Sequence, residues 1–201
     1  MHLRVTHALC YRCVMNEMHL EFLASDGWAK MLETDLLPWI VESGDLGDDV
    51  LEIGPGPGLT TDLLRARVPR VTTLELDDDL AATLAGRLKG TNVNVIHGDA
   101  TNSGLPDDRF TTATCFSMLH HMPEADMHDQ MFAEVHRVLK PGGQFVGVDA
   151  LDSEGMRAGH VDDTFVPVDP DTLGSRLEAA GFVGTELDIG DYQFRFRAKK
   201  G

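Results

Sequence analysis

From Asp49 onward, short apolar runs alternate with segments of helical periodicity. Strands are predicted at 49–53, 70–76, 92–96, 110–116 and 143–149, and helices at 59–68, 77–90 and 124–140. Strands that alternate with helices form a mostly parallel sheet with helices on both faces. The sequence therefore predicts an α/β fold, in which ligands bind beyond the carboxyl ends of the strands.

The two ends of the chain depart from this alternation. Near the carboxyl end, Asp169 and Gly181 cap a predicted helix over 169–182, and strands at 183–189 and 192–198 form a hairpin. One strand of this hairpin must run antiparallel to the others. Near the amino end, helical patterns cover 15–22 and 28–41, so we expect a helical segment or lid over 1–44 before a main domain at 45–201.

Composition restricts the class of protein. The 201 residues include 33 acidic and 17 basic side chains, and the formal net charge is −16. Such a surface repels phosphates, which disfavours nucleic acids and anionic membranes as partners. Three cysteines are too few for a disulfide framework, and no apolar run is long enough to span a membrane, so we expect a cytoplasmic protein.

A glycine loop connects the first predicted strand to the first helix of the alternating region. Gly54, Gly56 and Gly58 alternate there with Pro55 and Pro57. Glycine permits tight turns and lets a ligand touch the backbone, and the helix that follows offers N–H groups to an anionic group. The spacing is G-x-G-x-G, whereas the dinucleotide fingerprint is G-x-G-x-x-G.

Four motifs in chain order carry a family resemblance. They are E-x-G-x-G-x-G at 52–58, "VTTLELD" with Glu75, "VIHGDAT" with Asp99, and "FTTATCFSMLHHMP" followed by "EVHRVLKPGG". This set, over about residues 49–198, resembles the class I S-adenosylmethionine-dependent methyltransferases. The resemblance implies a Rossmann-like, seven-stranded sheet of order 3-2-1-4-5-7-6, with the seventh strand antiparallel and N-terminal helices over the site.

The same resemblance implies a set of cofactor contacts. S-adenosylmethionine would be the methyl donor and S-adenosylhomocysteine the product, with Glu75 accepting the ribose hydroxyls and Asp99 the adenine amino group. The residues expected at the cofactor are Glu52, Gly54, Pro55, Gly56, Gly58, Glu75, Leu76, Asp99, Ala100, Phe116, Ser117 and Met118.

The acceptor side is less defined by the motifs. The "LHH" element resembles the small-molecule branch of the family, so a small-molecule acceptor is expected. His121 is the first candidate for a general base, and His120 and Asp149 are further candidates. We expect substrate contacts from His19, Phe22 and Trp28. The loop over 151–168 is long for its place and is expected to complete the pocket.

Other kinds of site have weaker support. His120, His121 and His160 with Asp149 are conceivable as a metal cluster, but no H-E-x-x-H or H-x-x-E-H spacing occurs, so no metal is predicted. Cys10 and Cys13 have redox spacing without a thioredoxin-like context.

Three alternative functions remain open at this point. They are a nicotinamide-dependent oxidoreductase, a non-catalytic cofactor-binding subunit, and an aminopropyl transferase. The oligomeric state is also open, with a homodimer as one possibility.

Overall fold

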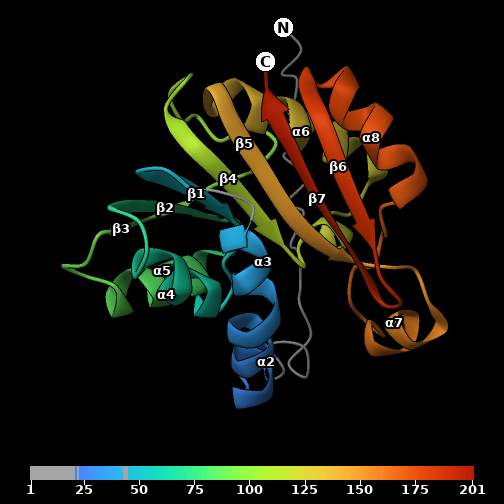
Figure 1. Cartoon of the computed structure of the whole chain (residues 1–201). Helices are drawn as coiled ribbons and strands as arrows, with labels where there is room; N and C mark the ends of the chain where they lie inside the picture. Colours follow the sequence, from blue (N-terminus) through green and yellow to red (C-terminus); the bar gives the residue numbers. More distant parts are fainter. Residues whose placement is uncertain (1–20, 22, 43–44) are drawn as a thin grey trace, which may run out of the picture.

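The computed structural model describes residue 21 and residues 23–42 and 45–201 (Figure 1). Its centre is one seven-stranded sheet of order β3-β2-β1-β4-β5-β7-β6. The strands are β1 (Asp49–Ile53), β2 (Arg70–Glu75), β3 (Val93–His97), β4 (Phe110–Phe116), β5 (Leu139–Ala150), β6 (Phe182–Ile189) and β7 (Gln193–Lys200). β7 runs antiparallel to both of its neighbours, and the pairs among β1 to β5 are parallel. The predicted fold class and strand order are confirmed.

Helices cover both faces of the sheet (Figure 1). The helical elements are α2 (Asp26–Met31), η1 (Leu32–Leu36), α3 (Leu37–Glu42), α4 (Leu59–Arg65), α5 (Asp78–Arg87), η2 (Leu119–His121), α6 (Ala125–Val138), α7 (Glu154–Gly159) and α8 (Pro170–Ala179). Buried side chains of α6 and α8 share one core cluster with Leu51 and Ile53 of β1. Buried side chains of η1, α3 and α4 share a second cluster with Val50. Successive side chains of a strand point to opposite faces, so β1 contributes to both cores.

The N-terminal helices pack as part of this second core. Ser25 is the N-cap of α2, because its Oγ accepts a hydrogen bond from the Trp28 N–H at 3.2 Å. The helical path then widens into a π-helix, η1, just before Pro38, which lacks an N–H for a regular α-helical bond. Arg195 of β7 forms an ion pair with Asp35 on η1. The boundary predicted at residue 44 stays a prediction, and the helix predicted over 15–22 lies outside the described residues apart from Glu21.

Two local features differ from the expected elements. The segment predicted as a loop over 151–168 contains α7, which begins where Ser153 Oγ accepts a hydrogen bond from Met156 N–H at 3.1 Å. β5 begins at Leu139 and not at residue 143, because its pairing with β4 continues past a register shift through Gly142, whose φ is +76°. Within the described residues, no helix has both the length and the apolar character needed to cross a bilayer.

Candidate functional site

A cavity of about 360 Å³ lies at the carboxyl ends of β1, β2 and β4, the edge at which a ligand site is expected. Five segments form most of its wall: 54–57, 75–77, 98–100, 116–118 and 121–123. The remaining lining residues are Leu23, Trp28, Ile53, Leu59, Thr60, Leu74, Leu80 and Met127. The structure thus brings together four motifs that are far apart in the sequence.

The glycine loop meets this cavity at Gly54 and Gly56. Gly54, Gly56 and Gly58 have φ of +64°, +52° and +86°, the region that favours glycine. A side chain at Gly54 would clash with Met118, and one at Gly58 would clash with Leu84. At Gly56 an added Cβ would meet no atom within 4 Å. A side chain at Gly54 or Gly58 would therefore displace a neighbouring side chain, whereas Gly56 leaves ligand space open.

Glu75 ties the second motif to the glycine loop. Its Oε2 accepts a hydrogen bond from Gly56 N–H at 3.1 Å, and its Oε1 accepts one from Asp77 N–H at 3.0 Å. Burial raises the pKa of Glu75, and these two N–H donors oppose the rise. The carboxylate is held in one orientation at the cavity wall.

Glu52 does not line the cavity but lies behind the loop. Its carboxylate accepts hydrogen bonds from the hydroxyls of Thr60 and Thr61, the latter at 2.6 Å. Burial raises the pKa of Glu52 to about 7. Its expected contact with a cofactor stays a prediction. In the structure Glu52 links β1 to the first turn of α4 through these two hydrogen bonds. Gly58, just before that turn, packs closely against Leu84.

The third motif presents Asp99 and Ala100 to the cavity. Asp99 Oδ1 also accepts a hydrogen bond from Thr101 N–H at 2.8 Å, so this carboxylate shapes its own turn. Leu76 lines the cavity and is 41% exposed, which makes it an apolar surface available to a planar ring.

The charge of the cavity wall has one sign. Glu75, Asp77 and Asp99 contribute carboxylates, and the described lining residues include neither lysine nor arginine. An environment of this kind attracts a cationic ligand and repels a pyrophosphate.

The end of β4 forms the cavity wall through Phe116, Ser117 and Met118. Ser117 has a φ of +52°, which is strained for a residue with a side chain. Its N–H donates to the carbonyl of Val148 at 2.8 Å. The chain bends sharply at Ser117, two residues before η2, the short helix that carries His120 and His121.

Hydrogen bonds from both sides hold η2 in place. Asp149 Oδ2 accepts from Leu119 N–H at 2.7 Å, and Asp149 Oδ1 lies 2.5 Å from His120 Nδ1. His128 Nε2 donates to the carbonyl of Leu119 at 2.8 Å. Of the three candidate catalytic residues, His121 alone lines the cavity. His120 and Asp149 meet behind it and are each 1% exposed, so the structure does not bring them to the ligand space.

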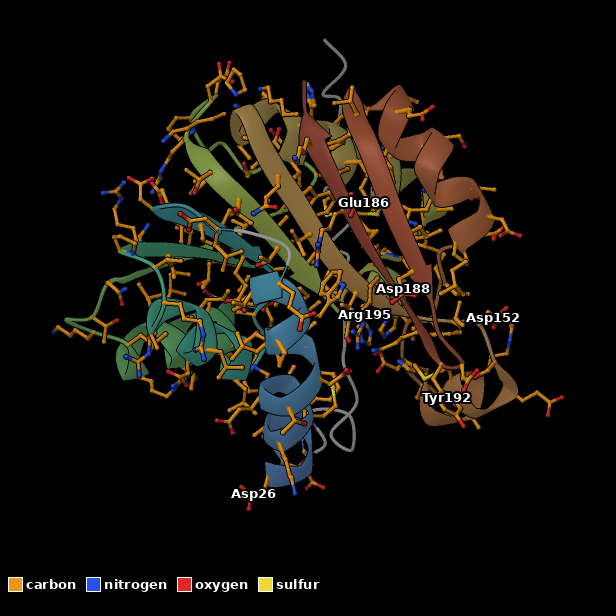
Figure 2. All side chains as sticks on the ribbon, viewed as in Figure 1. Asp26, Asp152, Glu186, Asp188, Tyr192 and Arg195 are labelled. Atoms are coloured by element: carbon orange, nitrogen blue, oxygen red, sulfur yellow. The ribbon has the colours of Figure 1, made fainter. Side chains whose placement is uncertain are left out.

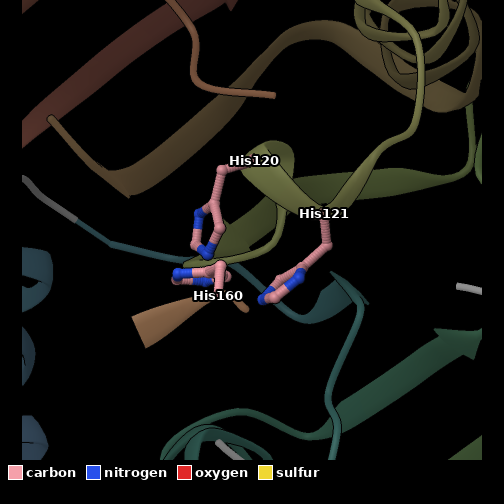
Figure 3. A group of neighbouring side chains, drawn as sticks. All are labelled: His120, His121 and His160. Atoms are coloured by element: carbon pink, nitrogen blue, oxygen red, sulfur yellow. The ribbon is translucent and has the colours of Figure 1, made fainter. Parts of the chain in front are cut away.

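A third histidine completes a cluster of which His121 lines the cavity and the other two do not. The ring centroids of His160 lie 5.1 Å from His120 and 5.3 Å from His121 (Figure 3). All three histidines are buried, and one ligand atom from each lies within 4.8 Å of the others. The segment 151–168 does not line the cavity as expected; it covers this cluster, with Phe165 against His120 and His160.

The acceptor-side residues divide into three groups. Trp28 lines the cavity, and its expected contact with substrate stays a prediction, whereas His19 and Phe22 lie outside the described residues. The sequence reasoning missed Leu80 and Met127, which lie in the first turn of α5 and of α6. A signal was present, because the first turn after such a strand faces the ligand edge. The prediction from sequence also omitted Met122 and Pro123, which directly follow His120 and His121.

Comparison with known proteins gives three kinds of match. Residues 51–147 match the model of a family described as "Methyltransferase domain". A ribosomal RNA small subunit methyltransferase A of Deinococcus radiodurans is 46% identical over 72 residues, which cover 35% of this chain and 25% of the relative. A ubiquinone biosynthesis O-methyltransferase of Pseudomonas syringae pv. tomato is 29% identical over 110 residues, which cover 53% of this chain and 46% of the relative.

The structural match is more extensive. A crystal structure of a SAM-dependent methyltransferase from Aquifex aeolicus superposes with a TM-score of 0.73 at 20% identity, covering 94% of this chain and 100% of that one. This likeness shows a shared fold. In contrast, the chain spans about a quarter to a half of the length of these two curated relatives.

Proposed function

Because the chain carries a class I S-adenosylmethionine-dependent methyltransferase domain, we propose that it transfers a methyl group from S-adenosylmethionine to a small-molecule acceptor. The observation that carries this proposal is the cavity of about 360 Å³ at the ends of β1, β2 and β4. Its volume falls in the range of roughly 300–1,000 Å³ that is typical of ligand pockets.

The residues of the cavity fit the cofactor. Gly56 leaves space beside the backbone, and Glu75 presents a fixed carboxylate that can accept the ribose hydroxyls. Leu76 offers an apolar face and Asp99 a carboxylate to the adenine, and both line the cavity. When bound, S-adenosylmethionine supplies an electrophilic methyl group on a cationic sulfur.

Charge supports this cofactor over a nicotinamide dinucleotide. Three carboxylates line the cavity, and its described lining residues include no lysine or arginine. A sulfonium and an ammonium group are attracted to such a wall, while the pyrophosphate of a dinucleotide is repelled.

For the acceptor we propose a position next to Trp28 and His121, which both line the cavity. His121 is 3% exposed and is the titratable side chain of η2 that lines the cavity, which makes it the candidate proton acceptor. The chain would contribute mainly alignment of the two reactants and exclusion of water.

Ribosomal RNA is the second candidate acceptor, because one relative is named for that reaction. The charge of this chain argues against it, since a net charge of −16 opposes a phosphate backbone. Exposed carboxylates come from elements far apart in the fold, such as Asp26, Asp152 and Asp188 (Figure 2).

The first experiment is calorimetric titration of the purified chain with S-adenosylmethionine, S-adenosylhomocysteine, NAD and NADP. We expect saturable binding of the first two only, and binding of NAD or NADP would contradict the proposal. Decarboxylated S-adenosylmethionine, titrated in parallel, tests for an aminopropyl transferase.

The second experiment identifies the acceptor with radiolabelled cofactor. Label should enter a panel of phenols, amines, carboxylic acids and thiols, with small-subunit ribosomal RNA in a parallel reaction. Transfer to RNA alone would refute a small-molecule acceptor. Cofactor binding without transfer to any acceptor would favour a non-catalytic subunit.

A further inference from the structure

The cluster of His120, His121 and His160 joins two separate parts of the fold. His120 and His121 belong to η2, and His160 caps the end of α7. The three side chains are 1%, 3% and 8% exposed, and one nitrogen of each lies within 4.8 Å of the others. Imidazole nitrogen is a preferred ligand of zinc and similar divalent cations. We propose that these three histidines bind one divalent transition-metal cation of the zinc class.

The distances are close to those of a metal site. Zinc–nitrogen bonds of 2.0–2.1 Å in a tetrahedron place two ligand nitrogens about 3.3 Å apart. The ligand atoms of the cluster must therefore approach one another by at most about 1.5 Å. Side-chain rotation supplies such a shift without a change of fold.

In two of the rings one nitrogen is hydrogen-bonded to an oxygen, and in the third it faces a carboxylate, the arrangement common among metal-binding histidines. His120 Nδ1 lies 2.5 Å from Asp149 Oδ1, and His160 Nδ1 lies 2.6 Å from the carbonyl of Met156. His121 Nδ1 lies 3.5 Å from Asp163 Oδ1. An Nδ1 that donates its hydrogen to oxygen leaves the lone pair on Nε2, the atom that would ligate the cation.

The charges behind the rings match a dication. The side chains of Asp149 and Asp163 have no exposed surface, and each carboxylate lies against one ring of the cluster, at 2.5 Å from His120 Nδ1 and 3.5 Å from His121 Nδ1. Two carboxylates next to three neutral imidazoles balance a charge of +2. Phe165 packs against His120 and His160 and limits the access of water to that side.

The site borders the cavity through His121, which belongs to both. Three protein ligands leave a coordination position for water or another ligand. A coordinated Nε2 has no lone pair for a proton, so in the metal-bound chain His121 is a ligand and not the general base. The binding of a cation itself does not depend on the proposed methyl transfer.

The test begins with the full chain carrying Cys10→Ser and Cys13→Ser. These two cysteines lie outside the described residues and are themselves potential zinc ligands, so their removal assigns any bound metal to the remaining side chains. The protein is stripped with a chelator, titrated with zinc sulfate or cobalt chloride, and assayed for bound metal. We expect one cation per chain, and the visible absorption of cobalt in a tetrahedral site.

Variants then locate the site. His160→Gln and His121→Gln should each abolish binding, and Asp163→Asn should weaken it by roughly 10- to 100-fold, the usual cost of losing a partner behind a ligand. His136→Gln removes a histidine outside the cluster and should bind like the parent. Circular dichroism of each stripped variant checks folding, and His121→Gln serves if His160→Gln does not fold.

Two results would overturn the metal proposal. One is the absence of binding to the stripped parent, and the other is equal binding by the parent and both cluster variants. Titration with S-adenosylmethionine in the same preparations separates this outcome from failure of the proposed function. Cofactor binding without metal binding refutes only the metal site, and the reverse result refutes only the cofactor assignment.

Discussion

The N–H of Gly56 donates a hydrogen bond to Oε2 of Glu75 at 3.1 Å, across 19 residues of sequence. This bond joins the loop after β1 to the end of β2, so the shape of one motif depends on the side chain of the other. The conformation of the glycine loop therefore depends on a side chain of β2, and a change at either Gly56 or Glu75 should alter ligand contacts at the other.

Gly56→Leu should abolish binding of S-adenosylmethionine while the fold is kept. The new side chain enters the space that the cofactor needs, since Gly56 lines the cavity and an added Cβ meets no atom within 4 Å. Calorimetry measures the affinity. Gly104→Leu is the matched control, because Gly104 also has a positive φ and an open environment but lies outside the cavity lining. Both variants should lose about 1–2 kcal/mol of stability, and unchanged affinity in Gly56→Leu would contradict the cofactor assignment.

Glu75→Ala and Asp99→Ala should each weaken cofactor binding by roughly 1–3 kcal/mol, the cost of losing a buried polar contact. Asp99→Asn separates two roles, because asparagine can still accept the hydrogen bond from Thr101 that shapes the turn. Asp188→Ala is the control, as this exposed carboxylate of β6 lies away from the cavity. If Asp188→Ala weakened binding as much, the effect would be one of overall charge.

Glu52 should make stability fall as the pH rises. Its pKa of about 7 lies above the ordinary value of 4.5, so the folded chain binds a proton at Glu52 more tightly than the unfolded chain does. The resulting contribution to the free energy of unfolding is fully present below pH 4.5 and is lost as the pH rises through 7. Between these limits the difference corresponds to roughly 3 kcal/mol. Glu52→Gln cannot titrate, so urea unfolding at several pH values should show a slope in the parent that the variant lacks. Equal slopes would mean that Glu52 titrates normally.

His128→Leu should destabilise the chain by roughly 1–3 kcal/mol. The change removes the donor to the buried carbonyl of Leu119, and an unsatisfied buried acceptor has a cost of that order. His128→Gln is the conservative control, since its amide can donate to the same oxygen. Urea denaturation of the two variants should separate them, and equal stabilities would show that water replaces the lost bond.

The sheet was predictable because each of its parts has a local signal. Apolar runs such as 49–53 end in glycine or acidic residues, and the resemblance supplied the strand order that periodicity alone leaves open. The cavity residues of the four motifs were predictable for the same reason, since Gly56, Glu75 and Asp99 each lie at or within three residues of the carboxyl end of a strand.

The histidine cluster was not predictable from spacing. His160 comes from α7, inside a segment with no clear period, and nothing in the sequence shows that it folds back onto η2. The placement of Glu52 was missed for a different reason. Its motif position indicates a ligand contact, but the alternation of side chains along β1 directs it under α4, to Thr60 and Thr61.

The place of β7 between β5 and β6 also governs how the chain can assemble during synthesis. β6 pairs with β7 and not with β5, although it leaves the ribosome before β7 does. A nascent chain can thus form the parallel half of the sheet early, while β6 waits for residues 193–200. A premature stop codon before that strand would leave β6 without its neighbour and the edge of β5 open, which makes such products targets for aggregation and for cellular quality control.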